Sequence, residues 1–135
     1  MNKTEAFAAL ALAAVACDGV FGRDEARALR QQLEFRYPYQ ELGESAMIAL
    51  FDQLLSQLRK DGVNGLISQA LPALSPQQQE TALAVSAQLI HSDGEVLEQE
   101  ALFLNELASK IDLPSERAMM VIQSISALNR DSLLN

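Results

Sequence analysis

Two stretches of this chain carry the same pattern, Asp-Gly-x-apolar-x-x-x-Glu. The first occupies residues 18–25 and the second residues 93–100, a constant offset of 75. Apolar residues at helical spacing flank each copy, so each copy predicts a helix, a short connection and a second helix. Two copies at so long an offset favour a pseudo-symmetric bundle, since a solenoid needs more repeats.

The correspondence continues on both sides of the motif. At the same offset, apolar or small residues near the first copy match apolar or small residues near the second. The matched pairs are Leu12 with Ala87, Val15 with Ile90, Cys17 with Ser92, Ala26 with Ala101, and Leu29 with Leu104. The repeat therefore includes the flanking helices.

These patterns predict a single all-α domain, residues 1–135, with about seven helices. No stretch alternates apolar and polar residues as a half-buried strand does. The strongest helix start has Ser75 as N-cap, Pro76 at the first position and Gln78 at the third. The expected helices are 3–17, 23–36, 44–60, 63–71, 76–91, 98–111 and a last one after Leu113-Pro114.

The first and fifth of these helices are apolar almost all round. Such helices sit in the middle of a bundle. Each of them leads directly into one of the Asp-Gly connections. We therefore expect the repeated units to supply the core, and both connections to reach the same end of the molecule.

The charge and the single cysteine narrow the classes of partner and compartment. The net charge is −8, and phosphate binding needs a basic surface, so we expect no nucleic-acid partner. Cys17 cannot form an internal disulfide, which predicts a cytoplasmic protein. The apolar stretch 6–17 is too short to span a bilayer, and Glu5 argues against a lipoprotein signal, so we expect no membrane insertion.

Most of the repeated motif has a purely structural interpretation. A glycine suits the left-handed position that ends a helix. An apolar residue suits the position before the next N-cap, and a glutamate three residues after the N-cap accepts a hydrogen bond from a free backbone N–H. The residues concerned are Gly19 and Gly94, Phe21 and Val96, and Glu25 and Glu100.

The two aspartates are harder to explain by structure alone. Asp18 and Asp93 lie at the negative end of a helix dipole, which is unfavourable by about 0.3–1 kcal/mol. A cation, an arginine or a free backbone N–H would compensate, so a metal site and loop hydrogen bonding both stay open. Asp24, Glu95 and Glu98 add further carboxylates. The spacing is not that of an EF-hand, whose glutamate is the twelfth loop residue.

The other reactive residues give little support for catalysis. His91 is either a ligand or a residue favoured at a helix C-terminus. Asp18 would raise the pKa of its neighbour Cys17, so we expect a small buried side chain there and not a nucleophile. No catalytic residue is assigned. The turn at residues 37–39 predicts aromatic side chains that anchor a partner or pack on the bundle.

An ordered set of short motifs resembles the tellurite-resistance TerB family and its TerB-like relatives over nearly the whole chain. Their order and spacing make the resemblance specific. The motifs are residues 58–62, 66–71 and 74–76, residues 92–96 with Glu100, and residues 111–113.

The resemblance implies an all-α fold with two pseudo-repeats, an acidic cluster that holds a divalent cation, and a bacterial cytoplasmic stress response beside membrane-bound partners. The chain departs from the family pattern at Val20, where the second copy is acidic, and at Leu97, where a polar cap is commoner. The implied metal positions are Asp18, Glu25, Asp93 and Glu100, with Glu95 and Glu98 in addition.

Two functional hypotheses follow. The first is a non-enzymatic stress-response module that binds calcium, magnesium, manganese or zinc through the paired acidic cluster, without an organic cofactor. The second is an interaction scaffold whose acidic end docks a cytoplasmic or membrane-associated protein partner without metal. A metal-dependent hydrolase is the weakest interpretation, because no general base stands apart from the cluster.

Overall fold

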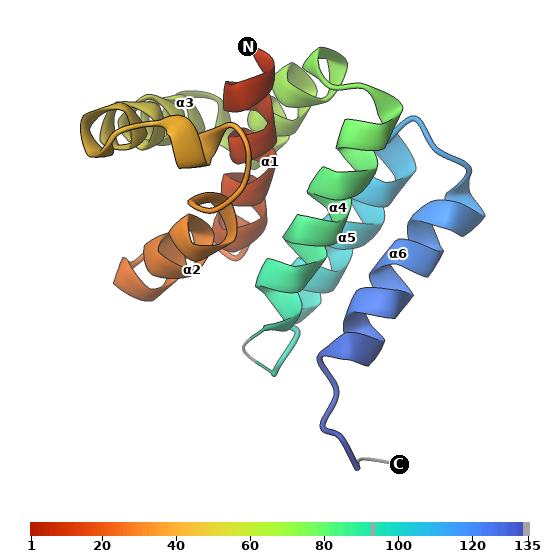
Figure 1. Ribbon diagram of the computed structural model, residues 1–135. Helices are drawn as coiled ribbons and strands as arrows, with labels where there is room; N and C mark the ends of the chain where they lie inside the picture. Colours follow the sequence, from red (N-terminus) through yellow and green to blue (C-terminus); the bar gives the residue numbers. More distant parts are fainter. Residues whose placement is uncertain (93, 134–135) are drawn as a thin grey trace.

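The computed structural model describes residues 1–92 and 94–133. Its regular structure consists of six α-helices and two 3-10 helices, with no strand in the described part (Figure 1). The predicted all-α class is thereby confirmed. The elements are α1 (Lys3–Ala16), α2 (Arg23–Leu33), η1 (Tyr39–Glu41), α3 (Glu44–Ala70), η2 (Leu71–Ala73), α4 (Pro76–His91), α5 (Glu98–Lys110) and α6 (Ser115–Leu128).

The first helix, α1, is buried on almost every face. It contacts α2, α3, α4 and α5, and Figure 1 shows it between α2 and α3 on one side and α4 to α6 on the other. Alanine carries a single methyl group, so helices packed on it approach closely. The fully buried residues of α1 include Ala6, Ala8, Ala9, Leu10, Ala11, Leu12, Ala13 and Ala14.

About seven helices were expected, and the described residues form six α-helices, one of which is divided by a kink. One element, α3, covers both segments expected at 44–60 and 63–71. Gly62 within it has φ 75° and ψ 178°, a conformation that glycine adopts without strain. The glycine interrupts the helix at the expected turn, so α3 consists of two helical segments that are joined by a kink.

The end of α2 also differs from the prediction. The helix stops at Leu33 and not at Arg36, because the chain turns to carry Tyr39 into the core. The Tyr39 side chain is 2% exposed, and its hydroxyl donates to the Thr4 carbonyl oxygen at 2.6 Å. Tyr37 is 71% exposed and precedes a cis proline. One aromatic therefore packs on the bundle while the other faces solvent.

A buried amide joins three segments at the start of α4. The side chain of Gln79 donates to the carbonyl oxygens of Leu71 at 2.9 Å and Leu74 at 3.2 Å. It accepts from the backbone N–H of Asp112 at 2.7 Å. Gln79 is 7% exposed, so water could hardly take over its hydrogen bonds to these backbone groups if the side chain were removed. The amide thereby links η2, α4 and the α5–α6 connection.

We expect Gln79→Leu to lower the free energy of unfolding by about 2–4 kcal/mol. The substitution keeps the size of the side chain but leaves up to three backbone groups without a partner, at roughly 1–3 kcal/mol each when fully buried. Urea unfolding followed by circular dichroism measures the loss. The exposed neighbour Gln77 supplies the control, since Gln77→Leu should change stability by less than about 0.5 kcal/mol. Equal losses in the two variants would contradict the role of the amide.

Candidate functional site

The two Asp-Gly connections have matching backbones. Gly19 and Gly94 adopt left-handed φ values of 85° and 87°. Each glycine N–H donates to the carbonyl oxygen three residues earlier, at 3.0 and 3.1 Å. Cys17 and Ser92, the C-cap residues, share φ −67° and ψ −20°. The sequence correspondence between the copies is therefore also a correspondence of local geometry.

The two glutamates of the motif hold the start of the following helices. The carboxylate of Glu25 accepts from the Gly22 N–H at 2.9 Å, and that of Glu100 accepts from the Leu97 N–H at 2.9 Å. These are the backbone contacts that the spacing predicts. Gly22 and Leu97 make no side-chain cap in return. The glutamates thus have a structural role, and one oxygen of each carboxylate is held by it.

The aspartate of the first copy also makes a local contact. Oδ1 of Asp18 accepts from the Val20 N–H at 3.0 Å, the hydrogen bond of an Asx turn. The structural interpretation of Asp18 therefore accounts for one of its two carboxylate oxygens. Asp93, its counterpart in the second copy, lies outside the described residues.

Carboxylates from both copies line one cavity of about 260 Å³, which we call the connection pocket. Asp18, Asp24 and Glu25 come from the first copy, and Glu100 comes from the second. Apolar side chains of α1, α2 and α4 complete it. These are Ala14, Val15, Ala28, Leu89 and Ile90. The structure thus brings the beginning of α5 beside the connection between α1 and α2.

The negative field of this pocket acts on Cys17. Burial raises the pKa of the thiol to about 11, and the charges of Glu100 and Asp18 contribute to the increase, in that order. The thiol donates to the Ala14 carbonyl oxygen at 3.1 Å. It is therefore protonated at neutral pH, as a structural cysteine is. The contribution of Glu100 also means that a charge of the second copy acts inside the first.

The oxygen chemistry of the connection pocket suits a hard divalent cation. Within residues 1–92 and 94–133, however, no group of three or more His, Cys, Asp or Glu side chains is arranged to hold a metal ion. The described carboxylates alone do not form a complete site. Asp93, which the sequence analysis also names as a candidate ligand, lies outside the described residues.

The other predicted ligands lie elsewhere. Glu95 and Glu98 are exposed and are not among the residues that line the connection pocket. His91 ends α4 and lines a different cavity, together with Asn105 and Arg130. The structure thus groups Asp18, Glu25 and Glu100, with Asp24 as an added member, and leaves the other three described candidates apart.

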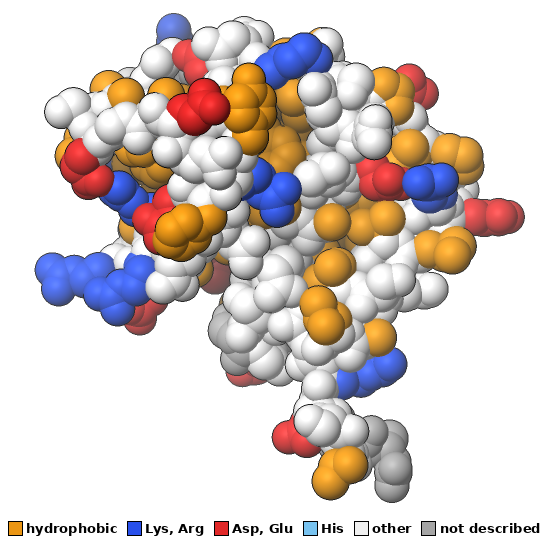
Figure 2. All heavy atoms as spheres, viewed as in Figure 1, with side chains coloured by type: hydrophobic (Ala, Val, Ile, Leu, Met, Phe, Trp, Pro, Cys, Tyr) orange, Lys and Arg blue, Asp and Glu red, His pale blue; other side chains and the backbone are white. Residues whose placement is uncertain are grey.

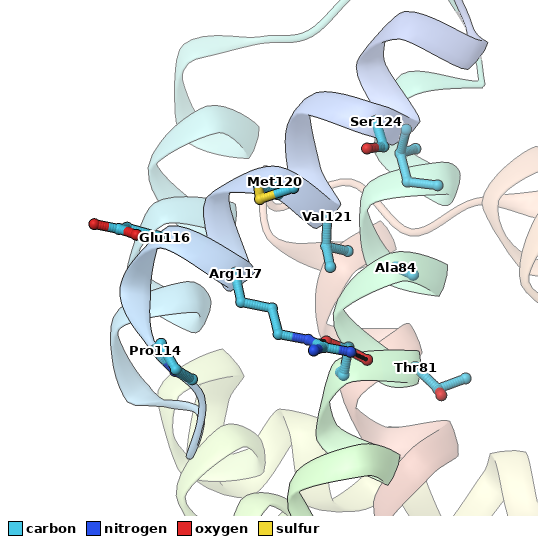
Figure 3. Close-up of a pocket in the computed structure, with 10 residues that line it drawn as sticks. Thr81, Ala84, Pro114, Glu116, Arg117, Met120, Val121 and Ser124 are labelled. Atoms are coloured by element: carbon cyan, nitrogen blue, oxygen red, sulfur yellow. Dashed lines mark hydrogen bonds and ion pairs between the residues drawn. The ribbon is translucent and has the colours of Figure 1, made fainter.

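A groove of about 720 Å³ lies between α4 and α6. Hydrophobic side chains gather on this face of the molecule (Figure 2). Arg117 reaches from α6 to α4, where it pairs with Glu80 and lowers the pKa of that carboxyl group (Figure 3). Sequence reasoning missed the groove, because apolar residues at helical spacing, such as Ile125, look like core residues. The described lining of the groove consists of paired charges and mainly apolar side chains, so it does not supply a group of residues for catalysis.

The fold and the connection pocket define a class of protein: an all-helical domain in which two helix–Asp-Gly–helix units share one core and one acidic cavity. A family model described as "Tellurite resistance protein TerB" matches residues 4–122, nearly the whole chain. The chain therefore belongs to the TerB family, as the resemblance in its sequence indicated. Searches of curated proteins and of solved structures returned no match.

We expect Glu100→Gln to lower the pKa of Cys17 below its value of about 11. The amide removes the charge but keeps an acceptor for the Leu97 N–H. Rates of iodoacetamide alkylation against pH give the pKa. Because the folded pKa lies above the unfolded value of 9.0, the thiol contributes stability below pH 9 that is lost as the pH rises toward 11.

Asp18→Asn should also lower the pKa of Cys17. Asp52→Asn, on the exposed face of α3, should leave that pKa unchanged. An unchanged Cys17 pKa in Glu100→Gln would contradict the contact between the two copies.

Proposed function

We propose that this TerB-family chain is a non-catalytic module that binds a divalent cation at the connection pocket, with a role in resistance to tellurite or metal stress. One observation carries the proposal. Glu100 of the second copy lines the same cavity as Asp18, Asp24 and Glu25 of the first. Like charges gathered on one cavity repel one another, and a bound cation would relieve that repulsion.

The backbone contacts of these carboxylates support the proposal. A hydrogen bond from a backbone N–H fixes one oxygen of Asp18, Glu25 and Glu100. Carboxylates held in this way lose little further freedom when they bind a ligand. Oxygen donors favour calcium, magnesium or manganese, and zinc binds carboxylates as well.

Asp93 is the proposed remaining ligand, because it occupies the position that matches Asp18 in the repeat. With Asp18 and Asp93 both bound, the cation would join the α1–α2 connection to the α4–α5 connection. Its binding energy would then stabilise the packing of one repeated unit on the other. A binding module of this kind needs neither a nucleophile nor a general base.

Cation binding predicts a rise in melting temperature for chelator-treated protein. A ligand that binds only the folded state stabilises it by about 2.7 kcal/mol at a hundred times its Kd. Calcium, magnesium, manganese and zinc are added separately, and unfolding is followed by differential scanning calorimetry. Asp18→Asn together with Asp93→Asn should remove the rise. The same pair should raise the melting temperature without metal, because it reduces the repulsion among the carboxylates.

Asp52→Asn is the matched control, since it removes a charge from an exposed position on α3. It should leave the cation response intact. A melting temperature that no cation changes would overturn the proposal, and so would a full response in the double variant.

A second candidate function is docking of a protein partner at the acidic end. The observation that favours it is the exposure of apolar residues beside the carboxylates. Val20 is 57% exposed, Leu97 41% and Val96 37%. Exposed apolar residues with an acidic rim suit a partner that presents apolar and basic side chains.

Docking predicts that Glu95→Gln with Glu98→Gln weakens capture of such a partner severalfold in a pull-down, because part of the complementary charge is removed. The cation response should persist in this variant. Glu106→Gln with Glu116→Gln removes the same charge from exposed positions of α5 and α6 and serves as the control. Undiminished capture by the Glu95 and Glu98 variant would exclude the acidic end as the docking surface.

A further inference from the structure

A cavity of about 360 Å³ lies where α1 and α4 begin and where the chain turns after α2. It is basic, although the protein as a whole is strongly acidic. Lys3 and Arg36 line it, and none of its described lining residues is acidic. Thr4, Phe7, Tyr37 and Gln78 are also on its wall. We call it the basic cavity.

Arg36 lacks the partner that a half-buried guanidinium normally has. Its Nε is shut off from solvent without a hydrogen-bond acceptor. Its guanidinium lies over the Phe7 ring, 5.7 Å from the centroid. No ion pair engages it in the described part of the chain, whereas Arg30 and Arg117 both pair with glutamates there. Arg36 is therefore a charged donor placed at a cavity without its counter-charge.

An oxyanion is the chemical group that fits this placement. The guanidinium lines the cavity with its full positive charge, and an anion bound there would balance that charge. A guanidinium presents its donors as a planar fork that matches a carboxylate or a phosphate. The helix dipoles also favour an anion here, because α1 and α4 both begin at this cavity and a helix N-terminus is positive.

The rest of the wall supplies further donors and an apolar surface. Lys3 Nζ lies 2.8 Å from the side-chain oxygen of Gln78, which holds the ammonium at the cavity. The ring of Tyr37 is exposed at the rim, and that of Phe7 lies inside. The volume is much larger than a bare oxyanion needs and falls at the lower end of the range for small-molecule sites. A molecule that fills this cavity would therefore need an apolar body as well as a charged head.

We propose that the basic cavity binds a small organic oxyanion, with its phosphoryl or carboxyl group on Arg36 and Lys3 and its apolar body against the aromatic wall. The site shares no lining residue with the connection pocket. It lies at the opposite end of α1, so it is independent of the cation proposal.

Isothermal titration of the full chain tests this with phenyl phosphate, benzoate and inorganic phosphate as probes. We expect saturable binding of phenyl phosphate or benzoate, and the stronger of the two identifies the preferred head group. Inorganic phosphate should bind at least about tenfold more weakly than phenyl phosphate, since it lacks the apolar body. Arg36→Gln should lose at least about tenfold in affinity, and Arg36→Lys should lose less, because the charge remains without the fork.

Arg27→Gln is the matched control, because it removes the same charge from an exposed position on α2. It should bind like the wild type. Lys3→Gln on the exposed first turn of α1 gives a second variant if Arg36→Gln disturbs folding, and it should also weaken binding. The proposal is overturned if neither organic probe binds saturably, or if both charge-removing variants bind like the wild type. Lys3→Gln should still show the rise in melting temperature with cations. This readout separates a failure of the oxyanion proposal from a failure of the cation proposal.

Discussion

Close packing around α1 is the constraint on which the rest of the structure depends. Its alanines present single methyl groups on nearly every face, so α2, α3, α4 and α5 can all lie against one helix. A central helix with larger side chains would hold these neighbours further apart. Because α4 packs beside α1, Ser92 and Glu100 of the second copy line one cavity together with Asp18 of the first. The small side chains of the first helix therefore account for the acidic pocket as well as for the core.

Local sequence signals predicted the elements that depend on local chemistry. The starts of α1, α2, α3, α4 and α5, the left-handed glycines and the glutamate contacts at the N-caps all follow from propensity and spacing. The end of α2 did not follow, because it depends on a distant contact, the hydroxyl of Tyr39 on the carbonyl of Thr4. The break expected between residues 60 and 63 is present as the kink at Gly62, because a glycine there adopts a left-handed conformation without strain.

The candidate site also has features that local sequence predicts and features that depend on distant contacts. The repeat pointed to Asp18, Glu25 and Glu100, but only tertiary packing makes Glu100 raise the pKa of Cys17. The basic cavity had no signal in the sequence at all. Its residues come from the first turn of α1, the turn after α2 and the first turns of α4, and no single segment carries a pattern. That no described residue lining this cavity is acidic is visible only when these segments are assembled.

The paired course of α1 and α4 spans the molecule from one cavity to the other. Both helices begin at the basic cavity and end at the connection pocket. At a rise of 1.5 Å per residue, the 14 residues of α1 separate these ends by roughly 20 Å. Both helices are packed in the core over this length, α1 on almost every face. They therefore act as spacers that hold the two cavities at a set distance from each other.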